Sequence, residues 1–100
     1  MLIRSQDKEI LVNMETSIVF HISGVIGKKY PIFVYWKGDG YVIGLYSTKA
    51  KAMKVLDMIQ EAYSEYQIML NFSVSYLHEF KEKTDGFAIF QMPEDSEVEA

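Results

Sequence analysis

Apolar and polar residues alternate in several short segments of the first half of the chain, as they do in β-strands with one buried face. Residues 17–23 show the alternation most regularly, so we predict a half-buried strand there. Residues 2–4 and 9–13 are two shorter apolar segments on either side of a polar stretch with the composition of a turn. These two segments predict a first β-hairpin.

A second hairpin is predicted from residues 30–37 and 41–46, which are joined by Gly38, Asp39 and Gly40. Asp-Gly favours a type I′ turn, because both central residues need a positive φ. Either Asp39-Gly40 or Gly38-Asp39 is expected as the central pair. The two choices differ in register by two residues, so they leave the same side chains on each face.

The predicted hairpin has two different faces. One face carries Ile32, Val34, Trp36, Tyr41, Ile43 and Leu45. The other carries Phe33, Tyr35, Lys37, Val42, Gly44 and Tyr46. We expect the first face to pack on the core, with Trp36 buried. The second face is then an exposed aromatic surface, unless another segment covers it or Tyr35 only shields the Gly44 backbone.

The period of the pattern changes from two residues to nearly four at Ser47. Ser47 is predicted to cap a helix that spans residues 48–66, because its hydroxyl accepts a hydrogen bond from a free amide of the first turn. The apolar stripe of this helix consists of Ala52, Met53, Val55, Leu56, Ile59 and Tyr63.

Residues 66–85 fit two patterns. Ile68 and Leu70 begin an alternation typical of a strand, but other apolar residues of the segment also fit a helix. We predict a short strand followed by a helical turn, and then a turn at Asp85-Gly86. Residues 87–92 are predicted to form a last strand.

These elements predict an α+β fold. It consists of a mainly antiparallel sheet of five or six strands, packed on one face by the one main helix, and it occupies residues 1–93 as a single domain. Residues 94–100 are acidic and poor in apolar side chains. We expect them to form a disordered tail.

Composition limits the possible chemistry. The chain has 100 residues and no cysteine, which excludes disulfides, thiol nucleophiles and cysteine-ligated zinc. The absence of cysteine also favours a reducing compartment. No apolar run approaches the roughly 20 residues that span a bilayer. We therefore predict a cytoplasmic protein that does not bind a membrane.

The remaining reactive groups do not form a recognisable catalytic pattern. His21 and His78 are the only histidines, and position 82 is a glutamate, so the HExxH zinc motif is absent. The carboxylates of Asp57, Glu61 and Glu65 share one helix face, which is typical of a solvated surface. The sequence therefore predicts no enzyme and no catalytic, metal or cofactor site.

Charge is distributed unevenly along the chain. Residues 1–54 contain eight basic and four acidic side chains, whereas residues 55–100 contain two basic and ten acidic ones. The lysines of the first part suggest a patch for an anion or a nucleic acid, formed by Lys28, Lys29, Lys37, Lys49 and Lys51. Two of these lysines lie in the first turn of the predicted helix, where the helix dipole favours an anionic partner.

Three segments resemble a group of small uncharacterised proteins found in Gram-positive bacteria and in their phages and mobile elements. The segments are IRSQDKEILVN, YSTKAKAMKVLDMIQEAY and FQMPED, and together they cover about half of the chain. The resemblance implies a cytoplasmic accessory protein related to phages or mobile elements. It implies no activity, cofactor or catalytic residue.

Three classes of function remain. The first is an interaction module that binds a protein partner, or a second copy of itself as a homodimer, through a strand edge or the exposed aromatic face formed by Phe33, Tyr35 and Tyr46. The second is a nucleic-acid-associated regulator that uses the lysine patch. A small enzyme or ligand-binding protein is a third possibility, and it needs a pocket that joins His21 to a carboxylate.

Overall fold

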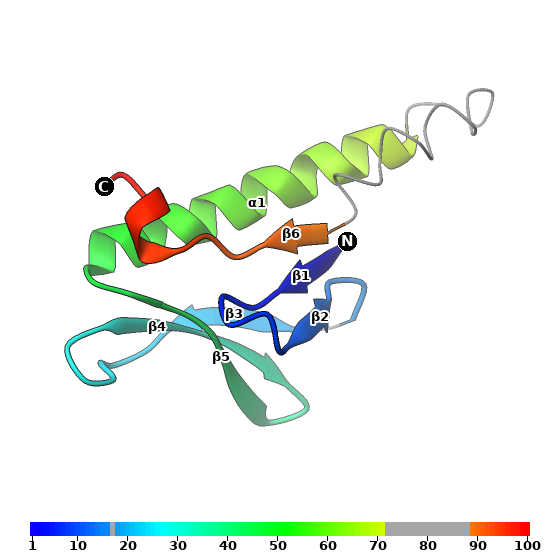
Figure 1. The fold of residues 1–100 in the computed structure, drawn as a ribbon. Coiled ribbons are helices and arrows are strands. Elements are labelled where there is room, and N and C mark those ends of the chain that lie inside the picture. The colour runs from blue at the N-terminus through cyan, green and yellow to red at the C-terminus, as the bar shows by residue number, and fades with distance from the viewer. Residues whose placement is uncertain (17, 72–88) are drawn as a thin grey trace.

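The computed structural model describes residues 1–16, 18–71 and 89–100, which form two small sheets and one long helix (Figure 1). Its elements in chain order are β1 (Leu2–Arg4), β2 (Leu11–Asn13), β3 (Val19–Ile22), β4 (Tyr30–Trp36), β5 (Asp39–Tyr46), α1 (Lys49–Asn71), β6 (Ile89–Gln91) and the 3-10 helix η2 (Asp95–Glu97).

The strands form two sheets of three, in the orders β2-β1-β6 and β3-β4-β5. All neighbours are antiparallel except β1 and β6, which are parallel. The α+β fold and the predominance of antiparallel pairing are thus confirmed. The sequence predicts five or six strands in a single sheet. The structure has six described strands, which are divided between two sheets.

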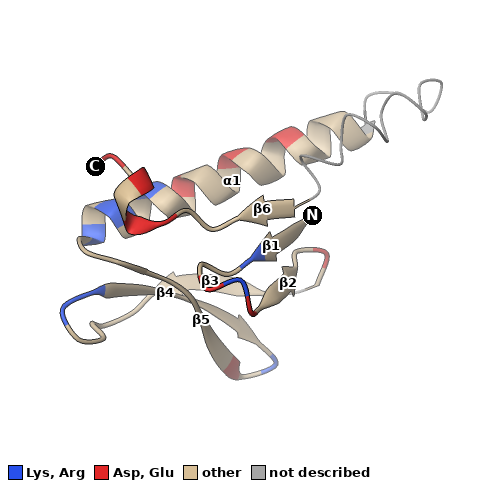
Figure 2. Ribbon diagram, in the orientation of Figure 1, with Lys and Arg blue, Asp and Glu red and all other residues tan. Residues whose placement is uncertain are grey.

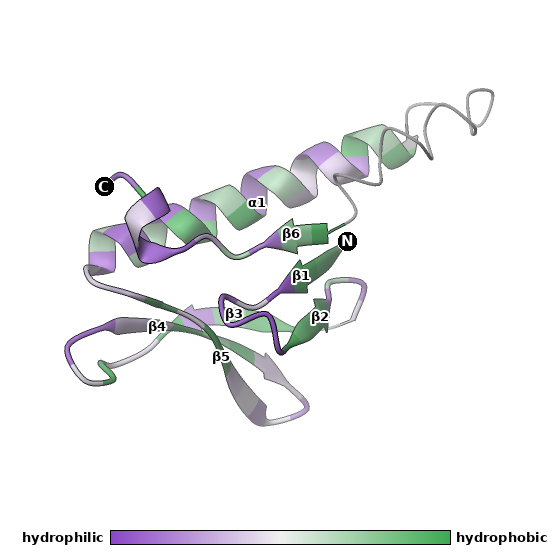
Figure 3. Ribbon diagram, in the orientation of Figure 1, coloured by the Kyte–Doolittle hydropathy of each residue, from purple (hydrophilic) through white to green (hydrophobic). Residues whose placement is uncertain are grey.

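Helix α1 lies against the sheet β3-β4-β5. The sheet β2-β1-β6 lies at one side, between the helix and that sheet (Figure 1). Figure 3 shows hydrophobic residues in β1 and β2 and hydrophilic residues in the turn between them. The core that these elements enclose consists mainly of Ile3, Val12, Ile32, Val34, Ile43, Tyr46, Ala52, Val55, Ile59 and Met92. The helix therefore covers one face of β3-β4-β5, which is the inner face of this sheet.

The turn between β4 and β5 is not the predicted one. Trp36 pairs with Asp39, so the two central residues are Lys37 and Gly38. Both have a positive φ, 51° for Lys37 and 87° for Gly38, as a type I′ turn requires. Glycine at the second central position makes this turn favourable although a lysine occupies the first.

A β-bulge interrupts the pairing of the two strands. Phe33 pairs with Val42, but the next residue of β4, Ile32, pairs with Gly44. Ile43 is therefore an extra residue in β5, and it is buried. Because side chains alternate along a strand, one extra residue changes which side chains of β5 face the core beyond that point.

This change explains why the predicted faces are wrong for the second half of β5. Tyr46 lies opposite Tyr30 and is completely buried, whereas Leu45 lies on the outer face. The Tyr46 hydroxyl donates a 2.8 Å hydrogen bond to the Pro93 carbonyl. Burial raises the pKa of this phenol, and nearby acidic side chains raise it further. A Cβ at Gly44 would lie only 2.9 Å from the Tyr46 ring, so the absence of a side chain there makes room for the ring.

Gln6 holds the bulged strand in place. Its backbone amide donates to the Ile43 carbonyl at 2.8 Å, and its side-chain oxygen accepts from the Leu45 amide at 2.8 Å. Its side-chain nitrogen donates to the carbonyls of Leu45 and Pro93, both at 3.2 Å. One residue thus joins the β1–β2 turn, the outer edge of β5 and the segment after β6.

Helix α1 begins at Lys49, one residue later than a cap at Ser47 predicts. Thr48, not Ser47, is the capping residue, because its hydroxyl oxygen accepts a 3.1 Å hydrogen bond from the Lys51 amide. The Ser47 amide instead donates to the carboxylate of Asp95 at 2.7 Å. Lys51 Nζ lies 3.3 Å from the same carboxylate. An anion from the chain itself therefore occupies the start of the helix.

The last residues are consequently part of the fold and do not form the expected disordered tail. Asp95 begins η2, which a capping box between Glu94 and Glu97 stabilises, and Val98 is buried in the core. The hydrogen bond from the Ser47 amide is the largest cause that lowers the pKa of Asp95. Because the pKa of Asp95 is lowered, its carboxylate contributes fully to the stability of the fold at neutral pH. This contribution is lost as the pH falls through that pKa.

The helix extends to Asn71, so Ile68 and Leu70 are helical. The prediction of a strand at these two positions is therefore wrong. The remaining expectations for the segment, including the Asp85-Gly86 turn, lie outside the described residues. The last strand is confirmed over β6.

Replacing Gln6 with alanine is expected to lower the free energy of unfolding by about 1–3 kcal/mol, because the part-buried amide and carbonyl of Leu45 lose their partner. Urea unfolding measures this loss. Gln60→Ala is the matched control, since Gln60 is exposed on the helix. An equal effect of both substitutions would contradict the role of Gln6.

Removing residues 94–100 is expected to lower the melting temperature by about 6 °C or more. Loss of the buried Val98 alone corresponds to about 1.5 kcal/mol. Removal of only the exposed Glu99 and Ala100 should leave the temperature unchanged. Circular dichroism melting curves compare the two truncations. Equal curves for the long truncation and the full chain would show that the tail does not contribute.

Candidate interaction surfaces

The polar side chains of the segments that carry the resemblance mostly serve the fold. Asp7 accepts hydrogen bonds from the Ser5 hydroxyl and from the Glu9 amide at 3.0 Å. These bonds lower the pKa of Asp7, and the Ser5 hydroxyl has the largest effect. Gln91 donates to the Ser5 carbonyl at 2.9 Å, which joins β6 to this turn. These groups hold the β1–β2 turn and β6 together, so they are occupied within the fold.

The first surface is the outer face of the sheet β3-β4-β5, on the side away from α1. Phe33 and Tyr35 stack there with their ring centroids 5.8 Å apart, and His21 lies 6.4 Å from Tyr35. Val19 is 61% exposed. We call these four residues the outer aromatic face. The prediction that Phe33 and Tyr35 share a face is confirmed.

Tyr46, the third member of the predicted aromatic surface, is not part of this face. Its side chain points into the core because of the bulge at Ile43. The predicted shielding of Gly44 by Tyr35 is also wrong, because Tyr35 pairs with Gly40. A Cβ on Gly40 would lie 2.8 Å from the Tyr35 ring, so the ring covers this glycine instead.

The five predicted patch lysines do not form one surface. Lys28 and Lys29 lie in the loop before β4, at the same end of the sheet as Lys49, as Figure 2 shows. Lys37 lies at the other end of β4, roughly 25 Å away at the usual rise per strand residue. Lys51 is paired with Asp95. Three of the five lysines, Lys28, Lys29 and Lys49, therefore lie at one end of the molecule and do not take part in this ion pair.

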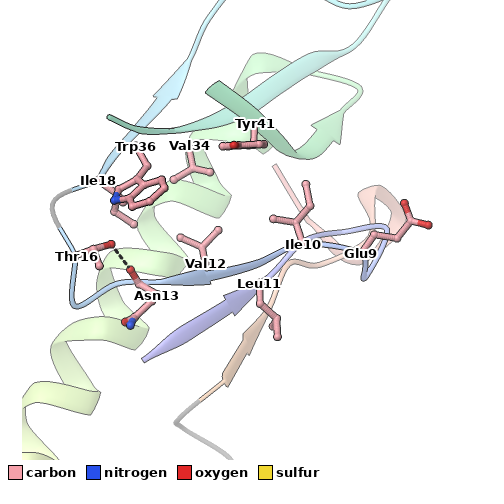
Figure 4. A pocket seen from close by; sticks show the side chains of 10 residues that line it. All are labelled: Glu9, Ile10, Leu11, Val12, Asn13, Thr16, Ile18, Val34, Trp36 and Tyr41. Carbon is pink, nitrogen blue, oxygen red and sulfur yellow. Dashed lines mark hydrogen bonds between the residues drawn. The ribbon is translucent and has the colours of Figure 1, made fainter. Parts of the chain in front are cut away.

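The second surface is a groove of about 480 Å³ between the two sheets (Figure 4). Its floor is the edge of the core, where Val12 and Val34 are buried. Its further lining residues are Glu9, Ile10, Leu11, Asn13, Thr16, Ile18, Trp36 and Tyr41. The volume falls within the range of ordinary ligand sites, and the lining is mostly apolar.

Trp36 is a wall of this groove instead of a core residue. It is 44% exposed, because it lies next to the turn, beyond the part of β4 that packs below the helix. Lys37 Nζ lies 4.8 Å from its ring centroid, at the distance of a cation–π contact. The prediction of a buried Trp36 is therefore wrong, although the residue does lie on the inner face of the sheet.

The groove does not bring together a catalytic pair. Glu9 is the one carboxylate among the described residues that line it, and His21 lies on the other face of the sheet, beside Tyr35. The other histidine, His78, lies outside the described residues. Within the described part of the chain, no three histidine or acidic side chains are placed to hold a metal ion. The described helices include none that is long and apolar enough to cross a membrane.

No protein-family model, curated protein or solved structure matches the chain. The sequence contained no sign of the groove, because its walls come from β2 and from the β4–β5 hairpin, which belong to different sheets.

Replacing Trp36 with alanine is expected to lower the free energy of unfolding by about 1–2 kcal/mol, less than the 3–5 kcal/mol of a buried tryptophan. Ile32→Ala, at a fully buried position of the same strand, is expected to cost about 2–5 kcal/mol. Urea unfolding of both variants tests the assignment of Trp36 to a groove wall. A larger loss for Trp36→Ala than for Ile32→Ala would contradict it.

Proposed function

We propose that the chain is a non-enzymatic interaction module that binds a protein partner through the outer aromatic face. The observation that carries this proposal is that no outward residue of the strands β3, β4 and β5 is a lysine, arginine, aspartate or glutamate. The outward positions of the three strands are Val19, His21, Pro31, Phe33, Tyr35, Gly40, Val42 and Leu45, of which Pro31 is buried.

An antiparallel sheet with one covered face normally alternates apolar and polar residues, because water meets the second face. Here His21 is the one polar side chain at the outward positions of the second face, and Val19 is well exposed. Exposed apolar patches of this kind mark binding sites more often than ordinary surface. Aromatic residues are also enriched at protein interfaces, where charged residues are depleted.

The size of the face favours a partner over a stable homodimer. Three strands spaced by about 4.8 Å, with seven residues rising by about 3.3 Å each, cover roughly 300 Å² of projected area. A standard stable interface buries about 800 Å² on each partner. The proposed complex is therefore a transient one, or one in which the partner also contacts neighbouring loops.

The division of the lysines favours this function over nucleic-acid association. Phosphate binding requires several cations placed along one nucleic-acid backbone. Lys37 lies at the other end of β4, and Lys51 is paired with Asp95, so neither joins the other three lysines in one patch. The enzyme alternative requires His21 beside a carboxylate, and no described carboxylate lies within ion-pair distance of it. The proposal keeps the cytoplasmic location that the sequence predicts.

Site-specific photo-crosslinking in cells that express the chain tests the proposal. A photo-reactive phenylalanine at Phe33 is expected to give a discrete protein adduct. The matched control is the same residue at Met53, an exposed apolar position on α1, where no such adduct is expected. Phe33→Lys should abolish the adduct formed from a photo-reactive residue at Val19, with little change in stability, because Phe33 is only partly buried.

Three outcomes would count against the proposal. Equal adducts at the two positions would show that the outer aromatic face is not selective. A nucleic-acid adduct at Phe33 would favour the lysine-based alternative. No adduct, together with a dimer that persists in high salt by light scattering, would assign the face to self-association.

A further inference from the structure

The groove between the sheets follows the free edge of β2. Five consecutive residues line it, from Glu9 to Asn13. Because side chains alternate along a strand, a cavity can contact every residue in turn only if it runs along the backbone edge. Figure 4 agrees, since Ile10 and Val12 point toward the Trp36 wall and Leu11 points away from it.

The hydrogen-bond pattern of β2 shows which backbone groups face the groove. The Ser5 amide donates to the Ile10 carbonyl at 2.8 Å, and the Met14 amide donates to the Met1 carbonyl at 3.0 Å. In an antiparallel ladder, hydrogen-bonded and non-bonded pairs alternate. Leu11, one position after Ile10, therefore directs its N–H and C=O away from β1.

Asn13 has the same orientation, so its N–H also points away from β1. Its carbonyl already accepts a 2.8 Å hydrogen bond from the Thr16 hydroxyl. Three backbone groups thus face the open edge, the N–H and C=O of Leu11 and the N–H of Asn13. β2 is the edge strand of its sheet, and no described strand pairs with it on this side.

The opposite wall supplies apolar surface at the right place for alternate side chains. Trp36 and Tyr41 are both about 45% exposed and project from the β4–β5 hairpin across the groove from Val12. A strand that pairs with β2 would direct every second side chain between this wall and the floor. Such pairing combines backbone affinity with side-chain selection.

Charge gives the direction of selectivity. Among the described residues of the lining, Glu9 is the only charged one, and it lies at the end of the groove opposite the Thr16–Asn13 hydrogen bond. We propose that the groove binds an extended segment of a partner protein as an additional strand on β2, with apolar side chains at alternate positions and a basic residue beside Glu9. The site is separate from the outer aromatic face, because the groove opens on the inner side of the same sheet.

Leu11→Pro is the most direct test, because it removes the N–H that the bound strand would use without removing a hydrogen bond to β1. Proline is tolerated at such positions of edge strands. Leu11→Val is the matched control, since it changes the side chain but keeps the N–H. Glu9→Lys provides a second variant that does not alter the strand, and melting curves verify that each variant is folded.

The probe is a random heptapeptide library displayed on phage and selected against the wild-type chain. We expect enriched peptides with apolar residues at alternate positions and a lysine or arginine at one end. Synthetic copies should change the fluorescence of Trp36, the only tryptophan of the chain, and shift the amide signals of Leu11 and Asn13 in NMR spectra. Their affinity should fall about tenfold in Leu11→Pro and stay unchanged in Leu11→Val. Selection against Glu9→Lys should enrich an acidic end residue instead.

Several results would overturn the inference. Peptides that bind Leu11→Pro as tightly as the wild type would exclude pairing with β2. Peptides that shift the amides of Val19 and Phe33 instead would assign peptide binding to the outer aromatic face. A selection without enrichment would exclude a peptide site in the groove. Failure of the photo-crosslinking test alone would leave these groove results unaffected.

Discussion

The hydrogen bonds between Gln6 and β5 are the interaction on which the rest of the structure depends. The bulge at Ile43 leaves backbone groups of β5 directed toward its outer edge, where none of the described strands pairs with them. Gln6 satisfies the Ile43 carbonyl and both backbone groups of Leu45. Its side-chain amide thus acts as a substitute for a neighbouring peptide bond. The bulge in turn directs Tyr46 into the core, where its hydroxyl meets Pro93.

The elements that depend on local periodicity could be predicted from the sequence. Both hairpins, the strand near Phe20 and the helix after Thr48 follow from alternation or from an amphipathic stripe, and the structure contains all of them. The α+β class follows from the same patterns. Local patterns also suffice to place Phe33 and Tyr35 on one face, because they are two positions apart in β4 and the extra residue of the bulge lies in β5.

The features that could not be predicted depend on contacts between distant residues. The position of Tyr46 requires the bulge, which Gln6 stabilises across 39 positions of sequence. Asp95 recruits the last residues to the helix start across 48 positions, so an acidic segment with the composition of a tail becomes structured. The predicted lysine patch failed for a similar reason. Lysines that are close in sequence lie at opposite ends of β4 or are paired with an acid from the other end of the chain.

The parallel pairing of β1 with β6 has a consequence for the kinetics of folding. Gln6 and Pro93, which meet beside this pair, are 87 positions apart. Closing a flexible loop of that length opposes folding by roughly 4 kcal/mol of chain entropy. Contacts of such long range form slowly. We therefore expect the β3-β4-β5 sheet and α1 to assemble first, and β6 to join β1 in the final, slowest step.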